Sequence, residues 1–283
     1  MAHGREVCLC PHHEGNSMRR RIPAVAGLFY PDDPTKIEAF VRPYAGPVHE
    51  KPGVRFLLGP HAGYVYSGAI AGEGYARVRI PDSVIIMGPN HTGFGHPQAV
   101  YAEGVFAMPS GDIAVDEELA ASLIDAMGLV DDERAHRQEH CIEVHLPFLY
   151  GKNPNVKIVP ICLGHLSFDA CEKLGRGLAS VLRKRDDVLV VVSTDMSHYV
   201  TADEASRLDK LALDQVVAVE PRALFDAVRH NDISMCGFIP TTVALVAARE
   251  LGLTEGELIR YGNSGETSGD YHRVVGYAAA MVS

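Results

Sequence analysis

The chain has 283 residues, 47% of them hydrophobic and 22% charged, which fits an ordinary globular protein and excludes disordered, collagen-like and disulfide-scaffold classes. Its formal net charge of −10 would repel a phosphate backbone, so we expect no nucleic-acid partner. No apolar stretch approaches the roughly 20 residues of a membrane span, and the six cysteines are scattered as reduced thiols would be, so we expect a cytoplasmic protein.

The first segment, residues 1–17, is polar and shows no helix or strand period. It contains two cysteines and two histidines in close sequence, namely Cys8, Cys10, His12 and His13. Such a cluster could bind a soft metal, but we interpret the segment as a disordered tail outside the fold. The basic run Arg19 to Arg21 that follows is typical of a solvated face. We therefore predict one domain over residues 18–283.

Further along the chain, short β-branched or aliphatic runs alternate with segments of helical spacing. The apolar runs predict buried strands at 54–58, 83–87, 156–162, 188–193, 258–262 and 274–282. The periodic segments, several with acidic starts, predict helices at 69–76, 116–127, 142–150, 169–184, 203–219 and 241–251. This alternation predicts a single three-layer α/β/α domain whose central sheet is mostly parallel or mixed.

Two predicted strands end in loops that share a Gly-Pro sequence followed by a histidine, His61 in the first and His91 in the second. In open α/β sheets, side chains beyond the carboxyl ends of the strands converge on one crevice, even when they are far apart in sequence. Neutral imidazole is a common metal ligand, so the two residues are candidate ligands. The alternative is that each is a hydrogen-bonded structural histidine.

Two neutral imidazoles need an anionic partner to hold a divalent ion firmly, and the candidates are Asp195 and Cys236. Cys236 stands just before a helical pattern, where the amide dipoles of the helix start would favour thiolate over thiol. The alternative for an isolated cysteine is a small buried apolar residue. We predict a site formed by His61, His91 and Cys236.

Asp195 and His198 follow the most β-branched strand and could form a carboxylate-oriented imidazole that moves protons beside a metal. An aspartate that caps the next helix, with a surface histidine after it, explains the same residues equally well. We keep proton transfer as their candidate role.

The segment 139–147 superficially resembles the H-E-x-x-H helix of zinc proteases, but His140 and His145 are five residues apart and would not share a helix face. Glu143 and His145 are candidate lining residues of the pocket, or Glu143 simply pairs locally. The loop residues Tyr64 and Asn90 complete the predicted lining. The turn-rich loop 263–272 could close over the pocket, or be a plain flexible connection.

Seven segments together resemble one known family, the Memo family, over nearly the whole of residues 18–283. They are 23–31, the loops around His61 and His91, 139–147, 193–199, the pair Cys236 and Gly237, and 270–277. Each motif alone is weak, whereas seven in the same order are specific. The compactness of the chain favours the prokaryotic members, which are named AmmeMemoRadiSam system protein B.

The resemblance implies a fold similar to class III extradiol dioxygenases, which hold non-heme Fe(II) at strand ends. By this resemblance His61, His91 and Cys236 fall on the Memo metal ligands, and Asp195 and His198 fall on neighbouring pocket residues. Cys236 replaces the carboxylate ligand of the dioxygenases. A thiolate donates more charge and favours redox-active iron or copper, which makes ring cleavage doubtful.

Three functions follow as hypotheses. The first is a metal-dependent redox protein with Fe(II) as the expected ion, Cu or Zn as alternatives, and O2 or a small organic molecule as the reactant. The second is a binding module for a peptide or for a partner protein of a radical-SAM system. The third, resting on fold analogy alone, is a ring-cleaving dioxygenase.

Overall fold

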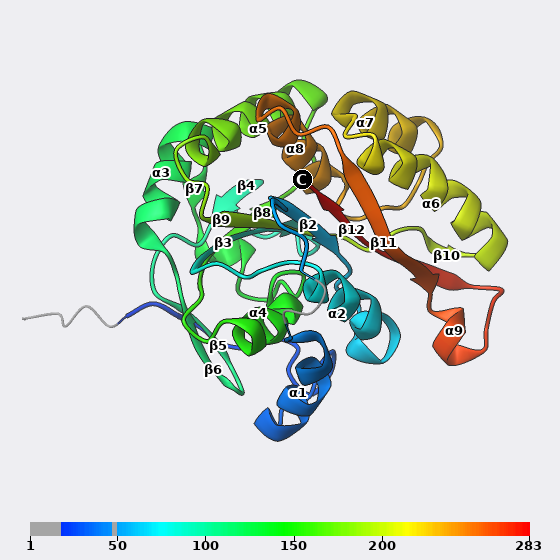
Figure 1. Cartoon of the computed structure of the whole chain (residues 1–283), viewed down its shortest axis with the longest axis horizontal. Helices are drawn as coiled ribbons and strands as arrows, with labels where there is room; N and C mark the ends of the chain where they lie inside the picture. The colour runs from blue at the N-terminus through cyan, green and yellow to red at the C-terminus, as the bar shows by residue number, and fades with distance from the viewer. Residues whose placement is uncertain (1–17, 47–49) are drawn as a thin grey trace, which may run out of the picture.

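The computed structural model describes residues 18–46 and 50–283. A twisted central sheet lies between two layers of helices, as the sequence predicts (Figure 1). In the described residues the strand order is β10-β12-β2-β9-β3-β8-β4-β7, and β11 pairs with the outer side of β12. The predicted tail, residues 1–17, lies outside the described residues. No helix in the described part is long and apolar enough to cross a membrane.

The centre of the sheet consists of four parallel strands: β2 (Phe56–Gly59), β9 (Val188–Ser193), β3 (Ser83–Pro89) and β8 (Lys157–Leu163). They are β-branched or aliphatic and almost wholly buried, as expected for strands covered on both faces. Antiparallel strands flank them, β12 (Val274–Val282) beside β2 and β4 (Gln98–Val100) beside β8. All four central strands therefore present their carboxyl ends at one edge.

Helices cover both faces of this sheet (Figure 1). One layer contains α3 (Glu117–Met127), α5 (Phe168–Leu182), α6 (Ala202–Val217), α7 (Pro221–His230) and α8 (Phe238–Glu250). The other layer contains α1 (Pro34–Val41), α2 (Ala69–Ala76) and α4 (Leu146–Lys152). Side-chain caps define several helix starts, because the oxygens of Asp116, Ser167 and Thr201 accept from backbone N–H groups of α3, α5 and α6.

Shorter elements complete the described chain. A small sheet contains β1 (Arg20–Arg21), β5 (Val105–Met108) and β6 (Gly111–Ala114), while β7 (Val130–Asp131), β10 (His198–Val200) and β11 (Gly256–Asn263) belong to the main sheet. Single turns of 3-10 helix lie at Arg42–Tyr44, Glu133–Ala135 and Glu143–His145, a π-helical turn at Tyr64–Gly68, and α9 at Gly265–Ser268. Every predicted strand is present, with its ends shifted by a few residues at most, and α1, α7 and the β5–β6 hairpin were not predicted.

Candidate metal centre

Three adjacent strands of the sheet each place a candidate residue two positions beyond their last residue. His61 follows β2, Asp195 follows β9 and His91 follows β3. Because β9 pairs in parallel with both β2 and β3, the three loops leave the same edge side by side. The side chains converge as the sequence predicts for residues at the carboxyl ends of parallel strands.

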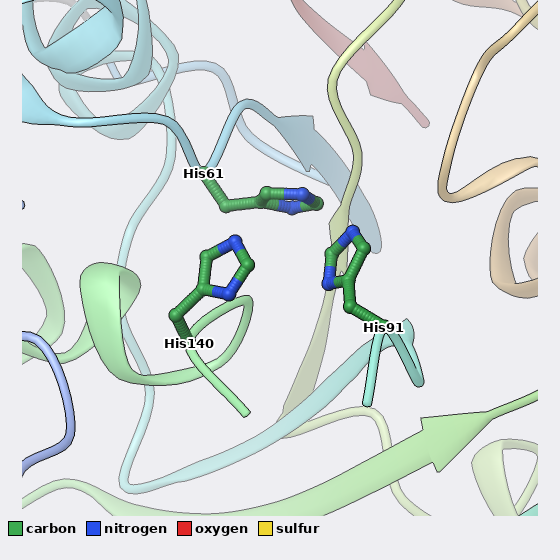
Figure 2. Close-up of side chains that lie close together, drawn as sticks. All are labelled: His61, His91 and His140. Carbon is green, nitrogen blue, oxygen red and sulfur yellow. The ribbon is translucent and has the colours of Figure 1, made fainter. Parts of the chain in front are cut away.

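A third imidazole, His140, joins His61 and His91 at this edge (Figure 2). One donor atom from each ring lies within 4.8 Å of the other two. The ring centroids of His61 and His91 are 5.0 Å apart with the planes at 79°, and those of His91 and His140 are 4.7 Å apart at 17°. His140 was not among the predicted site residues, and its signal in the sequence is the run of titratable residues from His136 to His145.

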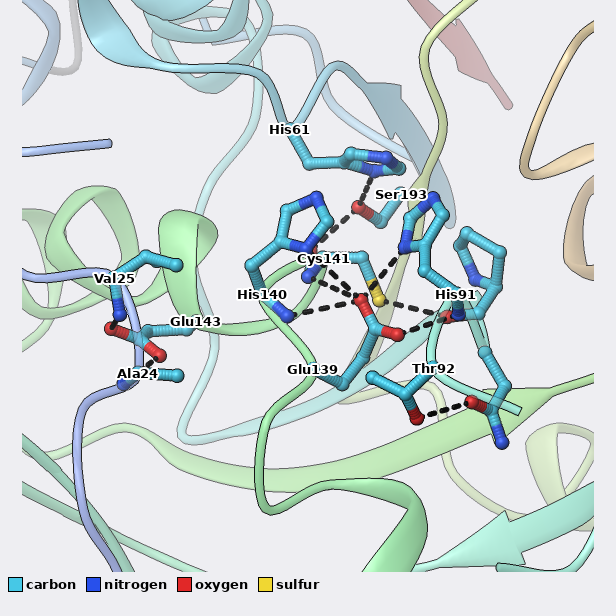
Figure 3. Close-up of polar contacts among 12 residues, drawn as sticks. Ala24, Val25, His61, His91, Thr92, Glu139, His140, Cys141, Glu143 and Ser193 are labelled. Atoms are coloured by element: carbon cyan, nitrogen blue, oxygen red, sulfur yellow. Dashed lines mark hydrogen bonds and ion pairs between the residues drawn. The ribbon is translucent and has the colours of Figure 1, made fainter. Parts of the chain in front are cut away.

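Ser193, the last residue of β9, determines how His61 presents its ring (Figure 3). The Ser193 hydroxyl donates to the carbonyl of Cys141 at 2.6 Å. Its oxygen must then accept from the ring nitrogens beside it, Nδ1 of His61 at 2.7 Å and Nε2 of His145 at 3.0 Å. His61 therefore carries its proton on Nδ1 and keeps a lone pair on Nε2.

His145 is in turn fixed by Tyr75, whose hydroxyl donates to Nδ1 at 3.0 Å. Burial lowers the pKa of His145 to about 3, so the ring is neutral and can only donate through Nε2. The pKa of His61 is well below its ordinary value because of burial first and the surrounding histidines second. His61 is therefore neutral in the absence of a cation, as a metal ligand must be.

Glu139 orients the ring of His91, as Ser193 orients the ring of His61. Its carboxylate accepts from Nδ1 of His91 at 2.8 Å and from the His91 backbone N–H at 2.7 Å (Figure 3). Burial raises the pKa of Glu139, but the hydrogen bond and charge of His91 outweigh it, so the pKa falls to about 2. The carboxylate is therefore ionised and holds a proton on Nδ1 of His91. Burial lowers the pKa of His91, but the hydrogen bond and charge of Glu139 outweigh it and raise that pKa, so an ion at Nε2 would have to displace a proton there.

Cys236 approaches His61 from the start of α8, with Sγ 3.3 Å from Nε2. Two ligands of a tetrahedral ion with bonds of about 2.1 and 2.3 Å stand roughly 3.6 Å apart, so this pair fits one ion. The approach depends on Gly237, because a Cβ there would overlap the Ser193 carbonyl and the Thr194 side chain. The backbone N–H of Asp195 donates to the sulfur at 3.2 Å.

The expectation of a free thiolate at Cys236 is wrong for the metal-free protein. Burial, and secondarily the charge of Asp195, raises the pKa of Cys236 well above its ordinary value. The dipole at the start of one helix does not outweigh that burial. The thiol therefore keeps its proton, which a cation bound here would have to displace.

His91 and His140 are alternative partners of His61 for one ion. Lone pairs of imidazole lie in the ring plane, and nearly parallel stacked planes cannot both direct them at one nearby point. The plane of His61 makes an angle of 79° with that of His91 and 83° with that of His140, which allows convergence with either ring. The Nδ1 atom of His140 lies 3.4 Å from a Glu139 oxygen, and burial lowers its pKa, so it is a neutral ring beside the ligands.

Asp195 lies against His61, and His198 stands at the start of β10, three residues further along the chain. A carboxylate oxygen of Asp195 accepts from the His61 backbone N–H at 2.8 Å, and the other oxygen is 3.9 Å from Nε2 of His61. Burial raises the pKa of Asp195 to about 6. His198 donates through Nδ1 to the carbonyl of Ser234 at 2.9 Å, which leaves its Nε2 as an acceptor.

The remaining predicted lining residues direct their polar atoms elsewhere. Glu143 is fully buried and accepts from Arg21, from two backbone N–H groups of the N-terminal segment and from Tyr30. The hydroxyl of Tyr64 donates to the carbonyl of Val144 at 2.8 Å. Asn90 shapes the His91 loop, since its side-chain amide donates to the Phe94 carbonyl at 2.7 Å. These contacts assign the three side chains a supporting role.

The fold and the histidine cluster define an α/β protein with a candidate metal centre at the carboxyl edge of its sheet. A family model described as Memo-like protein matches residues 21–281. The chain is 42% identical over 264 residues to a "MEMO1 family protein" of Aquifex aeolicus, covering 92% of this chain and 98% of the relative. It is 37% identical over 280 residues to a Methanopyrus kandleri protein of the same family, covering 92% and 98%.

This chain belongs to the Memo family, as its motifs suggest. A solved structure of an uncharacterized protein from Escherichia coli K12 shares the fold, with a TM-score of 0.51 and 14% sequence identity over 80% of this chain and 99% of that one. At that identity the likeness concerns the fold alone.

Proposed function

We propose that this protein binds one transition-metal ion through Nε2 of His61, Nε2 of His91 and the sulfur of Cys236, with Fe(II) as the first candidate and Cu or Zn as alternatives. The observation that carries the proposal is the orientation of the two imidazoles. Ser193 and Glu139 occupy Nδ1 of His61 and His91, so in each ring Nε2 is the nitrogen left to bind an ion. Ring orientation by such outer partners is characteristic of metal-binding histidines.

The choice of Cys236 as the third ligand is supported by charge and by geometry. Two neutral imidazoles leave a divalent ion without an anion, which the sulfur would supply on losing its proton. The sulfur also stands at a ligand-to-ligand distance from His61. His140, stacked on His91, is the alternative third ligand that the experiment must separate from Cys236.

We further propose that the site carries out redox chemistry on a small molecule. Iron or copper with an open position would supply one-electron chemistry and activation of O2. Around it, His198 has Nε2 free to accept a proton, and the carboxyl of Asp195, with its pKa raised to about 6, exchanges protons near neutral pH. These two residues are the candidates for proton transfer.

A second candidate function, the binding of a peptide, a partner protein or an organic ligand, has its own support. Each of three site loops continues into an exposed apolar side chain: Val65 after His61, Phe94 after His91 and Tyr199 after His198, with 73%, 61% and 65% of their surfaces exposed. Exposed apolar side chains around a polar centre favour a ligand that has both apolar and polar groups.

Ring cleavage rests only on fold analogy, and absence of O2 uptake with catechols would count against it.

Metal titration of the full chain, purified without oxygen, tests the metal proposal. We expect one equivalent of Fe(II) in the wild type, and affinity lowered at least about tenfold in His61→Ala, His91→Ala and Cys236→Ser. His230→Ala, an exposed histidine at the end of α7, is the control. Retention of full stoichiometry and affinity by the His91 and Cys236 variants would overturn the proposal, and loss in His140→Ala with retention in Cys236→Ser would assign the third ligand to His140.

A further inference from the structure

Two fully buried thiols lie in segments next to the histidine cluster: Cys141 follows His140 in the chain, and Cys162 is in β8, which pairs with the strand that leads to His91. Cys162 is in β8 and pairs in parallel register with Gly88 of β3, so side chains at these positions share one face of the sheet. A Cβ at Gly88 would overlap the sulfur of Cys141. The Cys141 sulfur therefore fills the place of the missing side chain, immediately beside the Cys162 side chain.

The two thiols have different partners. The sulfur of Cys141 donates to the carbonyl of Pro89 at 3.2 Å. The sulfur of Cys162 lies 3.5 Å from Nδ1 of His136, a buried imidazole whose Nε2 has no partner among the residues that the structure describes. Burial raises the pKa of Cys162, but the neighbouring Cys141 thiol and His136 imidazole outweigh it, so the pKa is lowered. Cys162 is thus the more nucleophilic thiol of the two.

The backbone of Cys141 connects this pair to the metal centre. Its N–H donates to Glu139 at 3.1 Å, and its carbonyl accepts from Ser193 at 2.6 Å (Figure 3). Glu139 and Ser193 are the groups that orient His91 and His61. The Cys141 sulfur also lies within 4.8 Å of donor atoms of His91 and Glu139. A displacement of Cys141 would therefore disturb both imidazoles.

We propose that Cys141 and Cys162 form a redox-active dithiol that hydrogen peroxide closes to a disulfide, and that closure weakens the metal centre. The Cys162 sulfur attacks one peroxide oxygen: an S–O bond forms, the O–O bond breaks, and water leaves with the thiol proton. The Cys141 sulfur then attacks the sulfenic sulfur: the S–S bond forms, the S–O bond breaks, and a second water leaves with the second proton. Each sulfur is oxidised by one electron, and the peroxide is reduced to two waters.

The dithiol is tested on metal-free full-length protein, so this part does not depend on the proposed metal function. After peroxide treatment and alkylation in denaturant, trypsin should give a linked pair of peptides, 138–152 and 158–173, that a reductant separates. Cys171 shares the second peptide, so Cys171→Ala, another buried cysteine, is the matched background. Fragmentation of the wild-type peptides assigns the same link without relying on a variant.

Two single variants test the order of the steps. Cys141→Ser should accumulate a dimedone-reactive sulfenic acid at Cys162, whereas Cys162→Ser should show none at Cys141. The proposal of a redox-active dithiol is overturned if both thiols of the folded protein remain free after peroxide treatment. Glutathione added to the same sample, and fully oxidised, shows that the peroxide was active. The proposal is equally overturned if the only disulfides found join other cysteines.

The effect on the metal centre rests on the proposed function and has a separate measurement. Zn(II), which is not itself redox-active, should bind the disulfide form at least about tenfold more weakly than the reduced form, and a reductant should restore the affinity. Cys162→Ser should show no such change after peroxide, which separates this effect from oxidation of Cys236. Equal affinity of the two forms would overturn the coupling, whereas absence of Zn(II) and Fe(II) binding by reduced protein would overturn the proposed function instead.

Discussion

The single hydroxyl proton of Ser193 goes to the Cys141 carbonyl, and this one bond decides the protonation of two histidines. With that proton committed, the serine oxygen can only accept, so His61 and His145 must both donate to it. The ring of His61 thereby keeps its lone pair on Nε2, as the proposed metal site requires. At the scale of the residue, hydrogen bonds to the outer ring nitrogens determine how the candidate ligands are oriented.

Ser193→Ala should weaken metal binding while leaving the fold intact. The Nδ1 atom of His61 loses its acceptor, so the proton is no longer confined to Nδ1 and the ring is free to rotate. We expect a fall of about 10–100-fold in affinity, measured by competition with a chelator of known affinity. Ser180→Ala, which removes a hydroxyl from α5, is the control. Equal affinities for the two variants would show that Ser193 has no orienting role.

His145 should make the protein lose stability as the pH falls. Its pKa is about 3 in the folded protein and about 6.5 in an unfolded chain, so between these values only the unfolded state binds the proton. The free energy of unfolding should therefore decrease by up to about 1.4 kcal/mol per pH unit below pH 6 on account of this residue. Urea denaturation of wild type and of His145→Gln between about pH 4 and about pH 7 measures this contribution to the free energy of unfolding. If the free energy of unfolding changes with pH equally in the two proteins, His145 is not held neutral by burial.

The sequence predicts His61, His91 and Cys236 because each stands at a strand end or helix start, a position that local pattern reveals. His140 has no such marker, since it lies in a loop between elements. Its placement depends on Glu139, which accepts from the backbone N–H groups of both His91 and His140. A contact between residues so far apart in the chain is not encoded in either local pattern.

At the scale of the element, the N-terminal segment supports the loop that carries His140. Arg21 of β1 is buried, forms an ion pair with Glu143 and donates to the His136 carbonyl. The expectation that Arg19 to Arg21 form a solvated face is therefore wrong at Arg21. The charge of Arg21 is neutralised by a carboxylate that lies more than a hundred positions further along the chain.

Arg21→Met should destabilise the protein by about 3–5 kcal/mol, because it leaves the buried carboxylate of Glu143 without its partner. Arg20→Met is the matched control, since Arg20 pairs with Asp112 on the surface and such exposed pairs contribute about 0–1 kcal/mol. Chemical denaturation of both variants compares the two free energies of unfolding. Similar losses of free energy of unfolding in the two variants would mean that the buried Arg21–Glu143 pair stabilises the protein no more than an exposed pair.

The elements that the sequence misses have few buried residues. The buried side chains of α7 are Leu224 and Val228, and those of α1 are Ile37 and Val41, so each of these short helices has only one pair of buried residues to reveal its period. The β5–β6 hairpin is short and lies outside the main sheet. By contrast, β3, β8 and β9 are nearly continuous apolar runs, which is why the central strands are predicted well.

At the scale of the whole molecule, strand order creates the site. The order β2-β9-β3 places β9, the last of these three strands in the chain, between two strands that precede it. Local sequence patterns predict each strand but not which strands become neighbours, so only the general rule about carboxyl ends led to the site. Register then aligns Gly59 with Ser193 and Met87 with Val192, which brings the three loops to the same level.

The most direct test of the metal centre is anomalous scattering from crystals of the protein grown without oxygen and loaded with Fe(II). A peak at the iron edge should lie within about 2.0–2.3 Å of Nε2 of His61, Nε2 of His91 and the sulfur of Cys236. A peak bonded to the imidazoles but remote from the sulfur, or a site elsewhere in the molecule, would contradict the assignment.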